Sequence, residues 1–216
     1  MDSARQRIEE TAVTLFNAEG YDAVSLREIA VAADTTIGNL TYHFHTKADL
    51  LEAVMSEPLE GYIALLDTTL KGHELLERFV DLFVMGSELA ERYPFYFKLG
   101  TAVPVTKRGK NGQKKSRRLT SSLLSRELQS YYTRGFKRLR KDGYLSTKLS
   151  DWSLGVMAST IVTVESSWVL DAKADYTKNA RPIRMADALC GVLLPAIEPQ
   201  YRDEYVAICE KRGVSF

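Results

Sequence analysis

The sequence predicts an all-α protein with an N-terminal three-helix unit that contains a helix-turn-helix and a larger C-terminal helical domain. Apolar residues recur at intervals of three and four along most of the 216 residues, as on the buried faces of helices. Capping residues divide this pattern into short segments near the N-terminus, and no segment alternates as a strand would. We expect one domain over residues 1–47 and a second over residues 48–216.

Composition excludes several classes of protein. Hydrophobic residues make up 45% and charged residues 26% of the chain, and the net charge of +1 favours neither nucleic acid nor membrane as a partner. Cys190 and Cys209 lack the spacing of a zinc site or a disulfide framework. The N-terminus lacks the apolar core of a signal peptide, and no apolar run approaches the roughly 18 residues of a membrane span. We therefore expect a cytoplasmic protein without a metal or cofactor.

Two short helices and a tight turn are predicted near the N-terminus. A first helix over residues 3–18 precedes them. Ser25 should cap a second helix over residues 26–33, with Glu28 completing a capping box. The turn falls at residues 34–35, and a third helix is expected over residues 37–43.

Helices also account for most of the remaining chain. Thr36 should cap the third helix, and Thr46 with Asp49 a fourth, which continues past Pro58 to about residue 70. Residues 94–103 predict a short helix of two turns, and residues 105–118 a basic loop. Further helices are expected over residues 74–92, 119–141, 151–170, 183–197 and 201–212.

The third helix suits the major groove of DNA. In a helix-turn-helix, the second helix of the pair lies in this groove with its N-terminal residues near the base edges. Thr36 and Asn39 place short polar groups there, and adenine is the favoured partner of Asn39. Gly38 permits close approach of the backbone, and Lys47 begins the next helix, where a phosphate is favoured. A generic structural turn is the alternative that spacing alone leaves open.

The residues themselves resemble the DNA-binding signature of the TetR family of transcriptional regulators. The resemblance covers residues 8–55 and includes the segment Tyr42-His43-Phe44. Its other elements are Phe16, Gly20, Ser25, Ile29, Ala30, Gly38, Leu40, Lys47, Leu50 and Leu51.

This resemblance implies a homodimer that places two third helices in the half-sites of a palindromic operator. It also implies a small-molecule effector that binds the larger domain and changes operator affinity; most members repress and some activate. The implied DNA-binding residues are Ser25, Thr35, Thr36, Ile37, Gly38, Asn39, Thr41, Tyr42, His43 and Lys47.

Three positions depart from the family pattern. Asp34 replaces a common turn glycine, although aspartate tolerates the left-handed backbone better than most residues. Ile37 stands where a polar or basic residue is frequent and could contact a thymine methyl group or weaken binding. Thr41 replaces a frequent tyrosine, so one phosphate contact could be shorter or lost. Residues 1–50 carry four basic and eight acidic residues, a formal charge of −4, which predicts few phosphate contacts.

The larger domain contains a group of aromatic residues on its central helices. They could line a pocket for an apolar or aromatic effector or simply pack the core, and both readings stay open. The candidate pocket residues are Phe79, Phe83, Tyr96, Tyr131, Tyr132 and Phe136.

A strongly basic run extends from Lys98 to Lys141. It contains fourteen lysines and arginines and one acidic residue, Glu127. Such a run is usually solvated. An anionic effector or additional DNA phosphates are the functional alternatives for the part over residues 105–118.

Two apolar helices, residues 151–170 and 183–197, are predicted to form the dimer interface. Small residues at Gly155, Ala158 and Ser159 would allow close helix approach, and Trp152 and Trp168 could flank the contact. The chain contains no nucleophile elbow, phosphate loop or zinc-protease motif, so we do not expect an enzyme. A dimeric interaction module that has lost DNA binding is the competing interpretation.

Overall fold

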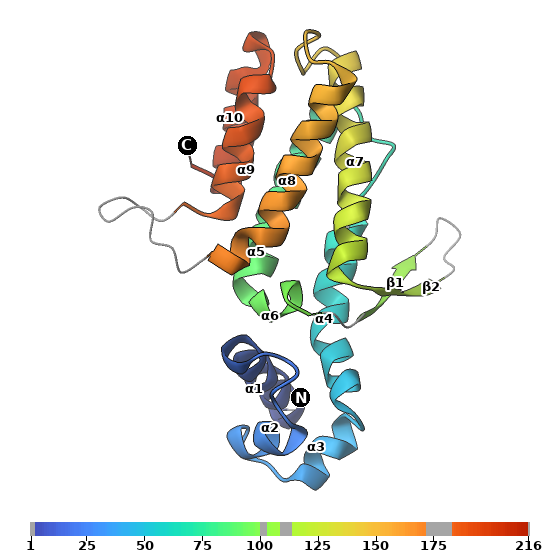
Figure 1. Cartoon of the computed structure of the whole chain (residues 1–216), viewed down its shortest axis with the longest axis vertical. Helices are drawn as coiled ribbons and strands as arrows, with labels where there is room; N and C mark the ends of the chain where they lie inside the picture. Colours follow the sequence, from blue (N-terminus) through green and yellow to red (C-terminus); the bar gives the residue numbers. More distant parts are fainter. Residues whose placement is uncertain (1–2, 100–102, 109–113, 172–182, 216) are drawn as a thin grey trace. The chain divides into compact units, whose positions relative to one another are not determined.

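The computed structural model describes residues 3–99, 103–108, 114–171 and 183–215, and these are predominantly helical (Figure 1). The predicted all-α class is confirmed, with one small hairpin as an exception. Contacts divide the chain into two compact units, one formed by Met1–Ile63 with Tyr93–Ser121 and the other by Ala64–Arg92 with Ser122–Phe216. The predicted boundary at residue 47 lies inside the first of these units. As a division between the expected DNA-binding part and the rest of the chain, it stays a prediction.

The first unit contains α1 (Ser3–Glu19), α2 (Leu26–Ala32), α3 (Ile37–His43), α4 (Lys47–Ala64) and α6 (Pro94–Phe97). Phe16 is fully buried, and its ring meets that of Phe95 edge-on at 5.3 Å. The apolar positions that predicted these helices form the core: Ile8, Ala12, Phe16, Ile29, Leu40, Phe44, Leu50 and Leu51.

Side-chain caps fix where α2 and α4 begin. The Ser25 hydroxyl accepts a hydrogen bond from the Glu28 amide, and the Glu28 carboxylate accepts one from the Ser25 amide at 2.7 Å. Thr46 and Asp49 exchange the equivalent pair of bonds at the start of α4. Both predicted capping boxes are confirmed.

Asp34 adopts the left-handed backbone that its place in the turn requires, with φ of +48°. The amide of Thr35 then donates to the carbonyl oxygen of Ala30 at 3.0 Å, which closes the end of α2. Aspartate therefore takes the conformation that glycine usually supplies in such turns.

The end of α4 differs from the prediction. The helix continues through Pro58 as expected but ends at Ala64 rather than near residue 70. The Asp67 carboxylate accepts hydrogen bonds from both the amide and the hydroxyl of Thr69, a local turn that competes with the helix.

The predicted basic loop over residues 105–118 is wrong in part, because β1 (Val103–Arg108) and β2 (Lys114–Leu119) form an antiparallel hairpin. Its open end is fixed by the pair Val103 and Leu119, which are opposite each other and buried. The short helix predicted over residues 94–103 is also wrong in extent, since α6 is a single turn.

The second unit is a helical bundle in which α5 (Gly72–Arg92) contacts α8 (Asp151–Asp171), α9 (Met185–Leu193) and α10 (Arg202–Lys211). The long helix α7 (Ser121–Lys141) completes it (Figure 1). The helix predicted over residues 183–197 is shorter than expected: α9 ends at Leu193, and a 3₁₀ turn follows over Leu194–Ala196. Pro195 lacks the amide that an α-helix would need there. Within the described residues, no helix is both long and apolar enough to cross a membrane.

Candidate nucleic-acid interface

Helix α3 presents a polar edge while one apolar side chain fixes it to the core. Leu40 is fully buried, and Phe44, which follows the helix, is nearly so. Thr36, Gly38 and Tyr42 are exposed. The helix is thereby positioned against α1 and α2 with its N-terminal residues facing solvent.

Three polar residues are ordered at the N-terminus of α3. The Thr36 hydroxyl accepts a hydrogen bond from the Asn39 amide at 3.1 Å, as predicted for the cap. The Asn39 side-chain nitrogen donates to the Thr35 hydroxyl at 2.8 Å. A carboxamide has a second N–H and an oxygen, the pair that recognises adenine in the major groove. The bond to Thr35 therefore orients Asn39 without using the groups that would read a base.

Exposed apolar and aromatic side chains flank this polar group. Ile37 is 42% exposed and Tyr42 is 79% exposed. The Tyr42 and His43 rings meet edge-on at 5.2 Å. This surface can offer a methyl contact from Ile37 and a phenol from Tyr42.

Thr41 uses its hydroxyl within the helix. The Oγ1 atom donates to the carbonyl oxygens of Ile37 and Gly38 at 2.9 and 3.1 Å. Ser25 similarly uses its hydroxyl as the cap of α2. Both predicted contact residues lie at this surface, but their hydroxyls already have local acceptor or donor partners.

Lys47 holds the connection between α1 and α2 in place. Its ammonium group donates to the carbonyl oxygens of Tyr21 and Val24 at 2.8 Å each, and a third carbonyl, that of Asp22, lies at 3.4 Å. The same nitrogen lies 4.4 Å from the centre of the Tyr21 ring. The sequence indicated a phosphate contact at Lys47, whereas the geometry shows an ammonium group with its donors directed into the domain.

Two of the three arginines on α1 and α2 also have partners within this domain. Arg7 donates to the carbonyl oxygen of Ala33 at 2.8 Å, and Arg5 pairs with Glu9 at 3.0 Å. Arg27 is exposed on α2 and has no ion pair among the described residues. Arg27 is absent from the contacts predicted from the sequence, where it entered only the net charge. Its position in the first turn of α2 is a signal that could have indicated a phosphate contact.

The aromatic residues predicted to line an effector pocket divide between the two units. Phe79, at the centre of the larger group, contacts the rings of Tyr131, Tyr132 and Phe136 edge-on at 5.1–5.8 Å. Gly135 makes this packing possible, since a Cβ atom there would lie 2.4 Å from the Phe79 ring. Phe83 completes the group through Tyr132, whereas Tyr96 belongs to the first unit.

The cluster of Phe79, Phe83, Tyr131, Tyr132 and Phe136 is closely packed and includes one carboxylate. The Tyr132 hydroxyl donates to Glu165 at 2.8 Å, and Glu165 is only 4% exposed. Burial raises the pKa of Tyr131 to about 12 and raises that of Tyr96 in the other unit as well. The phenols of Tyr131 and Tyr96 are therefore neutral at physiological pH.

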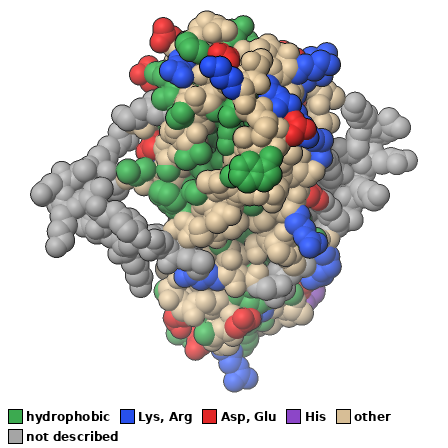
Figure 2. Space-filling model, turned by 45° about the horizontal axis from the view of Figure 1, so that its top comes forward, with side chains coloured by type: hydrophobic (Ala, Val, Ile, Leu, Met, Phe, Trp, Pro, Cys, Tyr) green, Lys and Arg blue, Asp and Glu red, His purple; other side chains and the backbone are tan. Residues whose placement is uncertain are grey.

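An uncharged surface follows α8 and α9, the two helices predicted to dimerise. Trp152 is 78% and Val156 43% exposed, and Val192 on α9 is exposed too. Figure 2 shows hydrophobic side chains gathered on the face that carries α8 in Figure 1, with charged side chains toward its margins. Of the small residues, Gly155 and Ser159 lie on this surface, whereas Ala158 is buried in the core.

Comparisons with known proteins agree with this geometry. Residues 8–54 match the family described as "Bacterial regulatory proteins, tetR family". The probable HTH-type transcriptional regulator YttP of Bacillus subtilis is 42% identical over 66 residues, which are 31% of this chain and 32% of that protein. The chain thus matches about a third of the length of this curated relative.

Solved structures extend the similarity to the whole fold. A gamma-butyrolactone receptor described as ArpA-like has a TM-score of 0.63 at 19% identity, covering 97% of this chain and 95% of the other. CprB of Streptomyces coelicolor, in complex with its biological operator sequence, has a TM-score of 0.62 at 19% identity, covering 96% and 95%.

The N-terminal part of the chain is a helix-turn-helix domain of the TetR family, and the resemblance in its sequence is confirmed. This family consists of DNA-binding transcriptional regulators and not of enzymes.

Proposed function

We propose that the chain is a ligand-responsive transcriptional repressor that binds a palindromic operator as a homodimer and is released by a small-molecule effector. The observation that carries this proposal is the solvent-facing N-terminus of α3, where Thr36 caps the helix and Asn39 is held by Thr35. A helix presented in this way fits the major groove, with its first residues at the base edges.

We assign three kinds of contact within this interface. Thr36, Gly38 and Asn39 face bases, with Ile37 against a thymine methyl group. Tyr42, His43 and Arg27 contact phosphates. Ser25, Thr35, Thr41 and Lys47 act mainly by positioning these groups, because their polar atoms bond within the domain.

The dimer is assigned to the exposed face of α8 with α9. The residues there are uncharged and include one large exposed aromatic side chain, Trp152, which is the composition expected at the core of a protein interface. The operator complex of CprB, a protein of the same fold, supports placing DNA at the helix-turn-helix end of each subunit.

An effector is assigned to the second unit. The gamma-butyrolactone receptor of the same fold is named for a small-molecule ligand, which supports a ligand-binding role for this domain.

A mobility-shift assay with the DNA upstream of its own gene tests the proposal. The wild-type chain should retard this DNA, and the double variant Thr36→Ala/Asn39→Ala should not, while Arg126→Ala on the exposed surface of α7 serves as the matched control. A wild-type protein that is folded and dimeric but binds none of this DNA would favour an interaction module instead.

A further inference from the structure

A cavity of about 320 Å³ lies within the second unit, between residues 67–75 and helix α7. This volume is in the range of small-molecule sites. It adjoins the aromatic cluster around Phe79, because Tyr131 belongs to that cluster and also lines the cavity.

One side of the cavity is strongly basic. Arg134, Lys137, Arg138 and Lys141 line it, at the spacing that places four residues on one face of a helix. Lys137 pairs with Asp151 at 2.7 Å and Arg138 with Asp142 at 3.1 Å. Arg134 and Lys141 have no ion pair among the described residues, so two positive charges at this wall lack a carboxylate partner there.

Apolar side chains also line the cavity. Leu75 and Tyr131, both nearly fully buried, are part of this lining, together with Leu70 and the backbone of Gly135. Asp67 is the acidic residue of the lining, and its carboxylate accepts two hydrogen bonds from Thr69. The cavity lining therefore combines cationic groups with apolar side chains.

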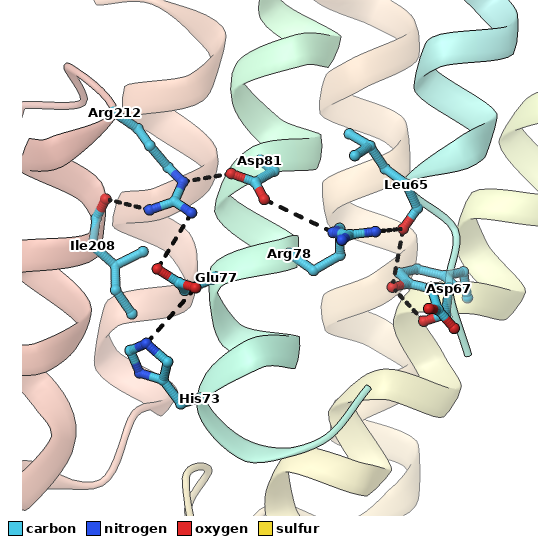
Figure 3. Close-up of polar contacts among 9 residues, drawn as sticks. Leu65, Asp67, His73, Glu77, Arg78, Asp81, Ile208 and Arg212 are labelled. Atoms are coloured by element: carbon cyan, nitrogen blue, oxygen red, sulfur yellow. Dashed lines mark hydrogen bonds and ion pairs between the residues drawn. The ribbon is translucent and has the colours of Figure 1, made fainter. Parts of the chain in front are cut away.

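Residues 65–67, the segment that leads to Asp67 of the cavity lining, are held by two hydrogen bonds. Tyr131 donates to the carbonyl oxygen of Asp67 at 3.0 Å, and Arg78 donates to that of Leu65 at 3.0 Å. Figure 3 shows how these contacts continue: Arg78 lies beside Asp81, which with Glu77 binds Arg212 of α10. Leu65 follows α4 directly in the chain, so this segment connects Asp67 of the cavity lining to the helix that succeeds the helix-turn-helix.

We propose that this cavity binds an amphiphilic organic anion, with its acidic group at Arg134 and Lys141 and its apolar body against Leu75 and Tyr131. Basic residues near the end of a helix also favour its dipole, but that role needs no cavity and no apolar lining. If the proposed function holds, this anion is the effector, and its contact with residues 67–70 is the route to α4.

Binding is tested on the full chain without DNA, which keeps the outcome independent of the proposed function. The fluorescent anion 8-anilinonaphthalene-1-sulfonate is titrated and then displaced by decanoate or by decanol, which differ in the acidic group. We expect saturable binding, displacement by decanoate and much weaker displacement by decanol. In Arg134→Ala/Lys141→Ala the affinity for the sulfonate should fall roughly tenfold or more, as for loss of charge-assisted bonds.

The matched control is Arg126→Ala/Lys148→Ala, which removes two exposed cations of the same unit away from the cavity. It should bind like wild type, and both variants should melt like wild type. Equal weakening in the two double variants, equal displacement by decanol, or no saturable binding would each overturn the proposal. A protein that binds decanoate as expected but never retards DNA would support the cavity assignment. The same result would contradict the proposed function.

Discussion

The ammonium nitrogen of Lys47 lies 2.8 Å from the carbonyl oxygen of Val24, a residue 23 positions earlier in the chain. With its contact to Tyr21, this bond closes the connection between α1 and α2 over the start of α4. Lys47, which the sequence indicated as a phosphate contact, therefore holds segments of the domain together.

Replacing Lys47 should first reduce stability. Lys47→Met should lower the free energy of unfolding by about 1–3 kcal/mol, because carbonyl groups lose a charged donor. Urea denaturation measures the change, with the exposed Lys148→Met as control. An unchanged midpoint in Lys47→Met, together with weakened DNA binding, would restore the phosphate role.

Alanine and glycine at position 34 should have different effects on the stability of the domain. Asp34→Ala should destabilise the domain by about 1–2 kcal/mol, since an alanine Cβ atom strains that backbone. Asp34→Gly should be neutral or slightly stabilising, because glycine adopts a φ of +48° without strain. Thermal melting of both variants decides this, and equal melting temperatures would contradict the account.

Asp151 should make the second unit sensitive to acid. Hydrogen bonds from Lys137 and Arg140 hold the pKa of this carboxyl below its usual value. A depressed folded-state pKa contributes stability that is present above the unfolded pKa, near 3.9, and is lost as the pH falls through the lower folded value.

Asp151→Asn should therefore melt below wild type at pH 7, and the difference should shrink toward zero as the pH falls below about 4. The exposed Asp203→Asn on α10 serves as the matched control and should follow wild type throughout. A difference between Asp151→Asn and wild type that stays constant with pH would exclude this ion pair as its cause.

The exposed face of α8 should control assembly. Trp152→Glu/Val156→Glu places two like charges at the centre of the proposed interface and should convert a dimer to a monomer at micromolar concentration. Sedimentation velocity measures this, with Val31→Glu on the exposed surface of α2 as control. A wild-type monomer, or an unaffected dimer in the double variant, would refute the assignment.

The features that could be predicted from the sequence depend on residues that lie close together in the chain. The capping pairs Ser25 with Glu28 and Thr46 with Asp49 lie within four residues of each other, so the sequence contains the whole interaction. The buried positions of α1 and α3 likewise follow from helical spacing, as at Phe16 and Leu40.

Contacts between distant segments could not be predicted in the same way. The bonds of Lys47 to Tyr21 and Val24 depend on how α4 packs against an earlier loop. The cavity at Arg134 and Lys141 depends on the course of residues 65–72, where α4 ends earlier than its periodicity indicated. The hairpin was missed because its charge suggested solvent, whereas the buried pair Val103 and Leu119 fixes it.

Selection of bound DNA from a random pool tests the central claim, that α3 reads bases through Asn39, most directly. Wild type should enrich an inverted repeat; Asn39→Ala should lose preference at one position per half-site, worth about 1–3 kcal/mol of discrimination. Arg27→Ala should instead weaken all sites about equally without altering the preferred sequence. Failure of wild type to enrich any inverted repeat, or an Asn39→Ala variant that selects the wild-type sequence, would contradict the account.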